Sequence, residues 1–374
     1  MHVHIVEPRA DGHRMQYVRR LIEHAPRDWP LTLSTFASAM DHPGTAAARQ
    51  AGGQRLRVLP ISGEDEFEAR VRGADGFKLQ PAYWQLLRRH WASLSQEQRG
   101  ERVLVPYLDY ISYAIGTVGS PFGPTPFAGV VMRPDFHWQA QGVVAPASRH
   151  GLLKRWLFLR LLRHPQLRSL VTIDPSLRDW VRQRAPAGAG RLHYADDPAD
   201  LQGQGDRHAA RQQLGLHSQG TVILMFGSID LRKGVAAALD LVVRPEFPAD
   251  GQLLLVGRQS EEVRRLVASH PAAARPGRIV SLDRYVDRQD EWWAFAAADF
   301  GWLAYEGFFG PSGVLAQCRQ AGLPMIHRAE GLIGYQLRKA RQLHLAWLSA
   351  VGLRASQLSS DPASSGGLEQ VYQS

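Results

Sequence analysis

Two basic side chains stand next to each other at the start of a helical segment in the second half of the chain. An apolar strand is expected over 221–226, it ends at Gly227, and Arg232 and Lys233 precede a helix a few residues later. The carboxyl ends of parallel strands and the first turn of a helix present unpaired N–H groups, which bind anions. Two added positive charges favour a diphosphate as the ligand. An ordinary strand-to-helix loop with two solvated cations is the alternative that stays open.

A second loop of this kind follows the strand expected over 300–304. It contains Glu306, then Gly and Pro residues that allow a tight turn, then Ser312 as a good N-cap and Gly313 at the start of a helix. A carboxylate on such a loop accepts hydrogen bonds from sugar hydroxyls. The competing interpretation of Glu306 is a solvated loop acid.

Residues of the first half follow expected strands in the same way. Gly12 and His13 come after the opening strand, and Asp109 comes after the fourth strand. Because ligands of parallel sheets lie beyond the carboxyl ends of the strands, these residues are expected to line a ligand site. His13 would touch a phosphate or an acceptor, or play a structural role at a helix start, and Asp109 would orient an acceptor hydroxyl. Asp135 and His137 lie in a Pro-aromatic loop and are weaker candidates.

Short β-rich runs alternate with helical patterns through both halves of the chain. The helix after Lys233 has apolar residues at positions 235, 238, 239 and 242, which is helical spacing. Strands separated by helices form βαβ units with a parallel sheet that is covered on both faces. The sequence therefore predicts an α/β protein with two Rossmann-like, doubly wound domains facing a central cleft. The strands are expected at 2–6, 31–36, 56–59, 102–106, 128–132, 170–173, 221–226, 252–256, 278–282, 300–304 and 324–327.

The boundaries follow from length and composition. A chain of 374 residues exceeds what one core usually organises, which is about 250 residues. The segment 196–205 contains two Asp, a Pro and two Gly and is the expected linker. We expect domains over 1–200 and 201–345, followed by a helix or tail over 346–374 for which a return to the first domain is one option.

Taken in order, the motifs of the second half resemble the donor domain of GT-B glycosyltransferases of family 4, which are retaining enzymes. No single motif is diagnostic, but the ordered series is. The first half resembles the acceptor domain only through its opening strand, Gly12-His13 and the segment 211–216, which often opens the second domain. The series in the second half comprises Gly227, Arg232-Lys233-Gly234, 253–257, 285–286, 297–299, 306–308, 312–315 and 321–326.

This resemblance implies a hexosyltransferase-type enzyme of polysaccharide biosynthesis. It would move a sugar from a nucleotide diphosphate sugar to a saccharide or a lipid-linked saccharide, with retention and with no metal or other cofactor. The domain over 1–200 would bind the acceptor and the domain over 201–345 the donor. Resemblance also suggests a front-face reaction in which the leaving phosphate helps to remove the acceptor proton.

The resemblance also assigns roles to single residues. Arg232 and Lys233 would neutralise the donor diphosphate, and Glu306 would contact the transferred sugar; these three are the catalytic candidates. The backbone near Tyr285 and Val286 would hold the nucleobase. The remaining donor-binding candidates, which would reach the phosphates or the sugar, are Gly227, Ser312, Gly313 and Val314. Gly12, His13 and Asp109 would form the acceptor or donor-phosphate loop.

The chain departs from the family at one acid. The family's motif has two glutamates separated by seven residues, and the second usually holds the ribose. Here the residue eight places after Glu306 is Val314, and the flanking landmarks align Gln317 with the second acid. A Gln hydrogen-bonds to a diol, but more weakly than a carboxylate does.

Composition limits the classes of partner and reaction. The 44 Lys and Arg residues against 35 Asp and Glu give a net charge of +9, which favours anionic partners such as nucleotides, phosphates, anionic membranes or nucleic acid. The one cysteine, Cys318, has no partner for a disulfide, and neither a secretory leader nor a membrane span is readable. We expect a cytoplasmic protein. Peripheral binding to the cytoplasmic face of the membrane is an alternative that stays open. The spacings of zinc hydrolases, serine hydrolases and P-loop kinases are absent from the sequence.

The segment 152–164 is the most apolar and basic part of the chain and is a candidate for membrane binding. Its four cations spread around the helical wheel, whereas a surface-bound helix gathers them on one face. A buried helix whose Arg stems reach outward is the competing interpretation.

Other functions stay open at this point. A nucleic-acid-binding protein would need clustered cations with stacking aromatics, and here the cations are dispersed, so no nucleic-acid partner is expected. A nucleotide-sugar epimerase or a catalytically inactive GT-B partner protein would keep the fold without the transfer reaction, and Gln317 keeps both alternatives in view.

Overall fold

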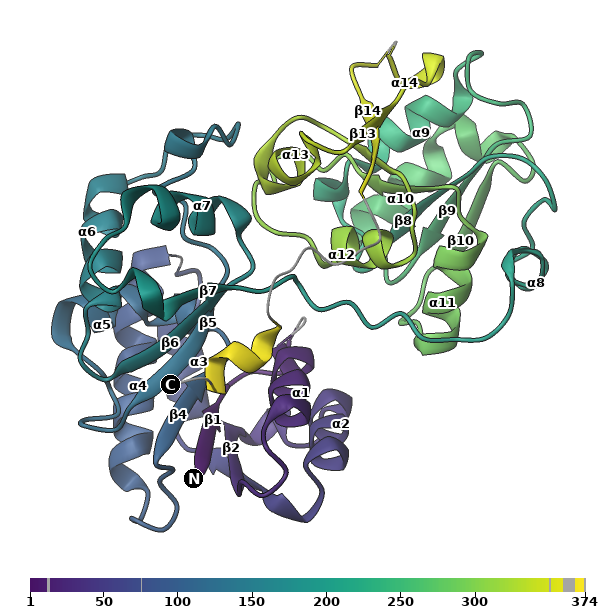
Figure 1. Ribbon diagram of the computed structural model, residues 1–374. Helices are drawn as coiled ribbons and strands as arrows, with labels where there is room; N and C mark the ends of the chain where they lie inside the picture. The colour runs from purple at the N-terminus through teal and green to yellow at the C-terminus, as the bar shows by residue number, and fades with distance from the viewer. Residues whose placement is uncertain (12–13, 75, 350, 359–366, 373–374) are drawn as a thin grey trace. The chain divides into compact units, whose positions relative to one another are not determined.

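The computed structural model describes residues 1–11, 14–74, 76–349, 351–358 and 367–372, and these fold into two compact units (Figure 1). The first unit takes 1–141, 146–196 and the described part of 364–374; the second takes 142–145 and the described part of 197–363. The segment after 345, for which we expect a helix or tail with a return to the first domain as one option, divides between the units. Its first part stays in the second unit because a strand at Arg354–Gln357 pairs there with Met325–His327.

The first unit is built on a sheet whose described strands are all parallel. Their spatial order is β3-β2-β1-β4-β5-β6-β7. The chain therefore places β2 and β3 in turn on one side of β1, and then β4 to β7 in turn on the other side. The strands are β1 (Val3–Val6), β2 (Leu31–Phe36), β3 (Leu56–Ile61), β4 (Arg102–Val105), β5 (Phe127–Val131), β6 (Leu167–Thr172) and β7 (Leu192–Tyr194).

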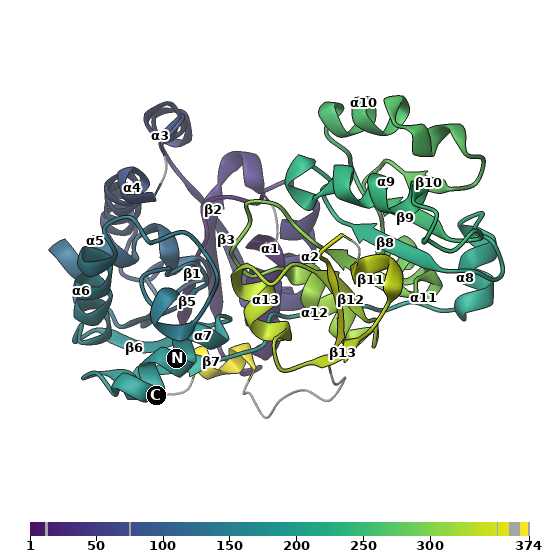
Figure 2. The same cartoon turned by 90° about the horizontal axis from the view of Figure 1, so that it is seen from above.

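Helices cover both faces of this sheet, as Figure 2 shows. The apolar stripe expected in the first helix is buried at Met15, Val18 and Ile22. The described C-terminal residues Leu368–Tyr372 form a short 3-10 helix in the same unit, where the Ser169 hydroxyl donates to the Gln370 carbonyl at 2.9 Å and Leu368 joins the core. The α-helices are α1 (Arg14–His24), α2 (Pro43–Gly52), α3 (Glu64–Val71), α4 (Leu79–Ser93), α5 (Ser112–Val118), α6 (Gly151–Leu162) and α7 (Pro175–Arg184).

The second unit repeats the plan with an antiparallel edge. Its strand order is β10-β9-β8-β11-β12-β14-β13; β10 to β12 are parallel, and β14 pairs antiparallel with both of its neighbours. Here too the chain builds outward from β8 and then resumes at β11 on the other side. The strands are β8 (Val222–Phe226), β9 (Gln252–Val256), β10 (Ile279–Leu282), β11 (Phe300–Leu303), β12 (Met325–His327), β13 (Arg341–Leu343) and β14 (Arg354–Gln357).

Side chains of β8 enter two separate cores, because alternate residues of a strand point to opposite faces. Val222, Leu224 and Phe226 belong to one core, together with residues of α11, and Ile223 and Met225 belong to the other, together with residues of α9. A strand buried on both faces explains the continuous apolar run. The helices are α8 (Arg207–Gln213), α9 (Val235–Val243), α10 (Glu261–Ser269), α11 (Arg288–Ala297), α12 (Gly313–Gln320), α13 (Gly331–Leu337) and α14 (Ala346–Ser349).

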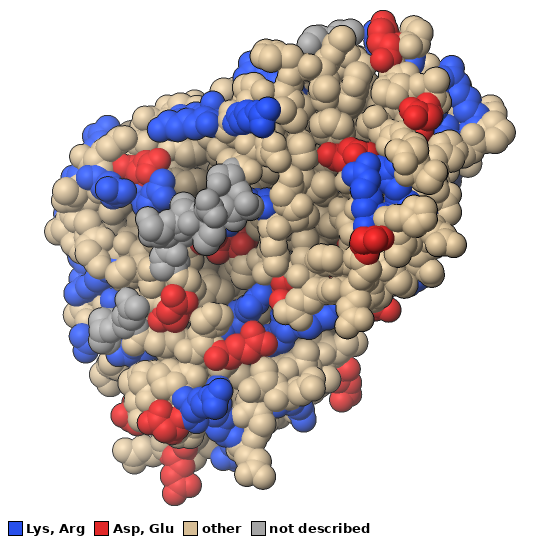
Figure 3. Space-filling model, turned by 45° about the vertical axis from the view of Figure 1, so that its right-hand side comes forward, with Lys and Arg blue, Asp and Glu red and all other residues tan. Residues whose placement is uncertain are grey.

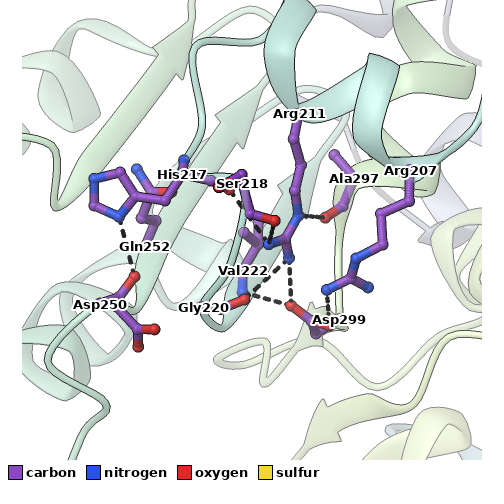
Figure 4. A network of polar contacts seen from close by, with 10 residues as sticks. All are labelled: Arg207, Arg211, His217, Ser218, Gly220, Val222, Asp250, Gln252, Ala297 and Asp299. Carbon is purple, nitrogen blue, oxygen red and sulfur yellow. Dashed lines mark hydrogen bonds and ion pairs between the residues drawn. The ribbon is translucent and has the colours of Figure 1, made fainter.

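A buried guanidinium ties α8 to the amino-terminal edge of the second sheet. Arg211 is 1 % exposed, and its guanidinium pairs with Asp299 at 2.8 Å. The same guanidinium donates to backbone carbonyls, and Asp299 also accepts from the Val222 amide (Figure 4). A buried charge requires such partners to offset its lost hydration. The carbonyl acceptors belong to Ala297, His217, Ser218 and Gly220.

Candidate functional site

The two loops singled out in the second half follow neighbouring parallel strands. In β8 and β11, Ile223 pairs with Phe300 and Leu224 with Gly301. The chain order reverses between these two strands, and such a switch point is where parallel sheets bind ligands, because the loops there diverge beyond the carboxyl ends. The topology therefore brings the loop of Arg232 and Lys233 next to the loop of Glu306.

The ends of β8 and β9 approach each other closely at two glycines. Gly227 has φ +94° and Gly257 φ +122°, and a Cβ built on Gly257 would lie 2.1 Å from the Gly227 carbonyl oxygen. Positive φ and this close approach both require glycine. Gly227, predicted as a donor-binding residue, thus lies at the exit of β8 and presents backbone rather than a side chain.

Lys233 is buried without an acidic partner. It is 7 % exposed, and its ammonium donates to the Phe226 carbonyl oxygen at 2.5 Å and to the Tyr305 hydroxyl at 3.3 Å. The ammonium also lies 5.1 Å from the centre of the Tyr305 ring. Among the described residues no carboxylate pairs with it. A buried cation is ordinarily paired, so the unpaired ammonium marks this position as a candidate site for an anion.

Backbone contacts fix this lysine against the second loop. Gly234 has φ +71°, and a Cβ added there would lie 2.5 Å from the Ala304 carbonyl oxygen. The Glu306 amide donates to the Arg232 carbonyl at 2.8 Å. The turn after β8 therefore packs directly on the end of β11, and Arg232, Lys233 and Glu306 are brought together as expected.

Arg232 lies closer to solvent than its neighbour. Its guanidinium stacks over the ring of Phe308 at 4.7 Å and lies 3.6 Å from Asp230, and its side chain is 48 % exposed. A half-exposed ion pair at this distance holds the guanidinium weakly. Arg232 can therefore turn toward an anionic ligand without losing a strong contact.

Glu306 carries its own counter-ion. Its carboxylate pairs with Arg328, which follows β12, at 3.0 Å, and its side chain is 50 % exposed. The acid thus keeps an acceptor surface open to solvent while the guanidinium orients it. This arrangement suits hydrogen bonds from hydroxyl groups.

The first turn of α12 opens beside this acid. Ser312 occupies the N-cap position, but its hydroxyl caps no backbone amide and lies 3.5 Å from the Tyr305 hydroxyl. Gly313 and Val314 are partly exposed in the first turn. Uncapped amides at a helix start are available to an anion or a polar ligand.

Gln317 meets a carboxylate from a different helix. Its amide nitrogen donates to Glu291 of α11. Burial raises the pKa of Glu291 to about 7, and the charge of Asp200 adds to this rise, while Gln317 and Arg288 oppose it. The acid that the family motif places at position 317 is missing, yet an acidic group lies directly beside that position.

The proposed base-binding pair lies at the end of β10. Tyr285 is 92 % exposed, and Val286 packs partly against the core of the unit. A fully exposed tyrosine ring offers a surface on which a planar ring stacks. No described contact joins Tyr285 to Lys233 or Glu306, so its part in the same site stays a prediction.

The candidates of the first unit have structural contacts or lie outside the description. Gly12 and His13 fall outside the described residues. The Asp109 carboxylate accepts from the amides of Met132 and Arg133, both at 2.9 Å, so it fastens the exit of β5. Burial raises the pKa of Asp109, and these hydrogen bonds oppose the rise.

The two weaker candidates of the first unit are also engaged. Asp135 pairs with Lys154 at 2.7 Å. His137 is completely buried and bonds to Asp174 at 3.0 Å and to the Ser176 hydroxyl at 2.9 Å. Both sets of contacts lie within the first unit and give these side chains structural roles.

Three residues of the site have no counterpart among the sequence-based candidates. Tyr305 and Arg328 contact Lys233 and Glu306 respectively, and Glu291 contacts Gln317. Tyr305 adjoins Glu306 in the chain, which is a signal that sequence reasoning could have used. Among the described residues, no group of His, Cys, Asp or Glu side chains is arranged to hold a metal ion.

The comparisons with known proteins concern the fold. No protein-family model and no curated protein matches the chain. Among solved structures it is similar to a sucrose-phosphate synthase from Thermosynechococcus elongatus, with 17 % identity, a TM-score of 0.60 and coverage of 90 % of this chain and 83 % of that one. HepE of Anabaena, in complex with UDP and glucose, matches with 15 % identity, a TM-score of 0.58 and coverage of 91 % and 84 %.

A third similar structure is WaaG, a glycosyltransferase involved in lipopolysaccharide biosynthesis, with 15 % identity, a TM-score of 0.55 and coverage of 89 % and 83 %. Each likeness extends over both units of this chain. The fold is therefore GT-B, with two Rossmann-like units, as the sequence predicted.

Proposed function

We propose that this protein is a glycosyltransferase of the family 4 type, which transfers a sugar from a nucleotide diphosphate sugar to a saccharide or lipid-linked saccharide acceptor with retention. The observation that carries the proposal is the buried ammonium of Lys233, which has no acidic partner among the described residues and lies at the switch point of the second sheet. The same fold in HepE, solved with UDP and glucose, supports a nucleotide-sugar donor.

The electrostatics of the site suit departure of a diphosphate. As the bond between the sugar and the donor phosphate breaks, negative charge grows on the leaving group. Lys233 is already held in place and desolvated, so it stabilises this growing charge more than the initial charge. Arg232 adds a second cation from the half-exposed side, and the uncapped amides of α12 add partial positive charge.

These groups supply the positive charge that a divalent ion supplies in other transferases. We therefore expect transfer to continue in EDTA. In this proposal Glu306, aligned by Arg328, accepts hydrogen bonds from the transferred sugar. The exposed ring of Tyr285 is available to stack on the base. No nucleophile of the chain is required if the leaving phosphate takes the acceptor proton.

A nucleic-acid ligand is less well supported. On the face drawn in Figure 3, Lys and Arg side chains alternate with Asp and Glu over a largely uncharged surface. Strong binding to the sugar-phosphate backbone of a nucleic acid needs a continuous track of basic side chains. The charge pattern of this face does not provide one.

The proposal is tested by donor binding followed by turnover. UDP-, GDP- and ADP-sugars are titrated calorimetrically into the full chain and into Lys233→Ala, with Lys339→Ala as a variant of an exposed lysine. We expect one base to bind the wild type and Lys339→Ala alike and to bind Lys233→Ala at least about tenfold more weakly, as loss of a charge-assisted contact predicts. Equal binding to all three proteins would remove the assignment.

The reaction products then distinguish a glycosyltransferase from an epimerase and from an inactive partner protein. Incubation with the binding donor, with and without a membrane and saccharide extract, is followed by NMR of the anomeric proton. Transfer with the donor's anomeric configuration supports the proposal. A changed sugar without acceptor would show an epimerase, and an unchanged donor under both conditions would show an inactive partner protein.

A further inference from the structure

The outer face of α6 in the first unit exposes large apolar side chains. Leu152 is 83 % exposed, Leu153 48 % and Trp156 51 %, and Val118 at the end of the neighbouring α5 is 62 % exposed. Both ribbon views place α5 and α6 side by side at the margin of their unit (Figures 1 and 2). Val118 lies toward the far end of α6, since the next residue, Gly119, adjoins His164. Leu152, Leu153 and Trp156 are close together at the start of α6 and indicate an interaction surface.

The two sides of this helix differ in burial, and both carry apolar side chains. At about 100° per residue, Leu152, Trp156 and Arg163 fall on one side of α6. The opposite side is fully occupied by the core of the unit. Its buried residues are Leu157, Phe158, Leu161 and Leu162. The competing interpretation of a simply buried helix is therefore wrong for the outer half of this segment.

The cations in and just after α6 differ in their surroundings, because one is paired within the unit and three are exposed. Lys154 turns inward, where its ammonium contacts Asp135 at 2.7 Å and the Ser148 hydroxyl at 3.1 Å. Arg155 and Arg160 flank the outward apolar side chains, and Arg163 continues the same side. The sequence-based objection, which counted Lys154 with the surface cations, is removed by this ion pair.

Arg155, Arg160 and Arg163 are exposed, and the Arg155 guanidinium lies 5.7 Å from the centre of the Trp180 ring. Among the described residues no ion pair involves Arg155, Arg160 or Arg163. The Arg160 guanidinium instead lies over the Trp156 ring at 4.8 Å. An indole with a neighbouring guanidinium combines an apolar body with a charged tip, which suits the boundary between lipid chains and headgroups.

We propose that the outer face of α6 docks the protein on the surface of an anionic phospholipid bilayer. Leu152, Leu153 and Trp156 enter the headgroup boundary, and Arg155 and Arg160 bind lipid phosphates on either side. This inference goes beyond sugar transfer and does not depend on it. A docked enzyme would meet lipid-linked acceptors at the membrane surface.

A second copy of the chain fits this surface less well. In a two-fold symmetric dimer the same patch faces itself. Arg155, Arg160 and Arg163 would then face their own copies without any described acid between them. Anionic headgroups complement both the charge and the apolar centre, so the membrane is the better partner.

Vesicle flotation tests the proposal with the full chain. The vesicles consist of phosphatidylcholine alone or of phosphatidylcholine mixed with phosphatidylglycerol. We expect the protein to float with the anionic vesicles, to stay behind with the neutral ones, and to dissociate as salt is raised. Failure to float with anionic vesicles at low salt overturns the proposal.

Surface variants identify the face. Arg155→Gln with Arg160→Gln should lower the partition coefficient on anionic vesicles about 30-fold, from the usual contribution of each basic side chain near such a surface. Leu152→Ser with Trp156→Ser should lower it about tenfold or more. Matched changes in the second unit, Arg275→Gln with Arg341→Gln, should leave it nearly unchanged. A loss in the second-unit arginine variant as large as that in Arg155→Gln with Arg160→Gln would show a general charge effect and overturn the assignment of this face.

A fluorescent label reports the contact without relying on affinity. Cys318 is fully buried, so a cysteine placed at an exposed position is the one that a dye labels readily. A polarity-sensitive dye on Leu153→Cys should shift to the blue when anionic vesicles are added, and the same dye on Arg275→Cys should not. A shift without vesicles that grows with protein concentration, matched by a dimer in light scattering, would instead assign this face to a second copy.

Discussion

The buried ammonium of Lys233, which pairs with no carboxylate in the part of the chain that the structure describes, is the most informative single group. Lys233 is 7 % exposed, and its polar contacts are a carbonyl and a phenol, which are both uncharged. Such contacts orient the charge but do not neutralise it. The buried ammonium of Lys233 therefore costs folding free energy. Such a cost is expected where the charged group binds a ligand.

The first prediction concerns this charge. Lys233→Ala should lower kcat about 10²- to 10³-fold, because it removes one preorganised group that stabilises the leaving diphosphate. Steady-state transfer kinetics measure the effect. Lys339→Ala removes an exposed lysine of the same unit and should keep kcat near the wild-type value. A normal rate in Lys233→Ala would contradict the assigned role.

The carboxyl group beside Gln317 gives the second prediction. The pKa of Glu291 is raised from 4.5 to about 7, chiefly by burial. Because the pKa of Glu291 is higher in the folded state than in the unfolded chain, the protonated acid contributes to stability. This contribution is complete below pH 4.5 and is lost as the pH rises through about 7. Glu291→Gln removes the ionisation, so it should be more stable than the wild type at pH 8 by about 1–2 kcal/mol, discounted for partial exposure.

Urea unfolding at pH 5 and pH 8 measures this difference. The gain of Glu291→Gln over the wild type should be larger at pH 8 than at pH 5. Glu246→Gln changes an exposed acid of the same unit and should show no such dependence. An equal difference at both pH values would mean that Glu291 ionises normally.

At the scale of the elements, the close approach of two loops depends on a glycine. Gly234 begins α9 with φ +71°, and its α-carbon faces the Ala304 carbonyl oxygen at the end of β11. Any side chain would push the turn that carries Arg232 and Lys233 away from the loop of Glu306. The geometry of the site is thus set where two βα loops touch.

Gly234→Ala should therefore reduce stability and turnover together. We expect a loss of about 2–4 kcal/mol, from the left-handed backbone and from overlap with the carbonyl. Gly322→Ala is the matched control, because Gly322 has φ +67° with no atom within 4 Å of an added Cβ. It should cost only about 1–2 kcal/mol and leave kcat unchanged. Chemical unfolding and transfer kinetics test both variants.

The guanidinium network at the other edge of the sheet fixes α8. Arg211 and Arg207 both pair with Asp299, but Arg211 is 1 % exposed and Arg207 49 %. Arg211→Met removes one of the donors to Asp299 and leaves several buried carbonyls without their donor, and should lower the free energy of unfolding of the second unit by about 3 kcal/mol. Arg207→Met should cost less than about 1 kcal/mol. Similar losses of unfolding free energy in the two variants would mean that burial does not determine how much each arginine's ion pair with Asp299 contributes.

At the scale of the whole molecule, the two units should differ in acid stability. In the first unit, His4 and His90 share the Ser34 hydroxyl at 2.7 and 2.8 Å. Burial lowers the pKa of His4 to about 3 and that of His90 to about 4. Both stay neutral in the folded state, while the unfolded chain protonates near pH 6.5. Their contribution is present above pH 6.5 and is lost as the pH falls toward 4.

We expect the loss to reach about 1–2 kcal/mol per histidine at pH 5. Hydrogen exchange followed by mass spectrometry should show β1 and β2 losing protection between pH 6.5 and pH 5 more than β8 and β9 do. His90→Gln should reduce this difference, whereas His24→Gln, at an exposed position, should not. Parallel loss of protection in both units would contradict the prediction.

Much of the fold follows from local patterns. β8 and β9 are almost continuously apolar, as a strand buried on both faces is expected to be, and β-rich runs with polar interruptions indicated the other long parallel strands. The strands that were missed are β7, β13 and β14, which have three, three and four residues and are incompletely buried. Such short segments are recognised only through their pairing partners, which no local pattern reveals.

The site divides in the same way. Local patterns were enough to locate the two candidate loops. Strand ends, helix starts and the types of Arg232, Lys233 and Glu306 can be recognised along the chain, and the topology of parallel sheets places the loops side by side. Three further findings required the folded structure. Lys233 is buried with no acidic partner among the described residues, Glu291 lies beside Gln317, and Lys154 pairs with Asp135 while Trp156 is exposed. These facts depend on contacts between residues distant in the chain, and burial and ion pairing arise only when separate elements pack.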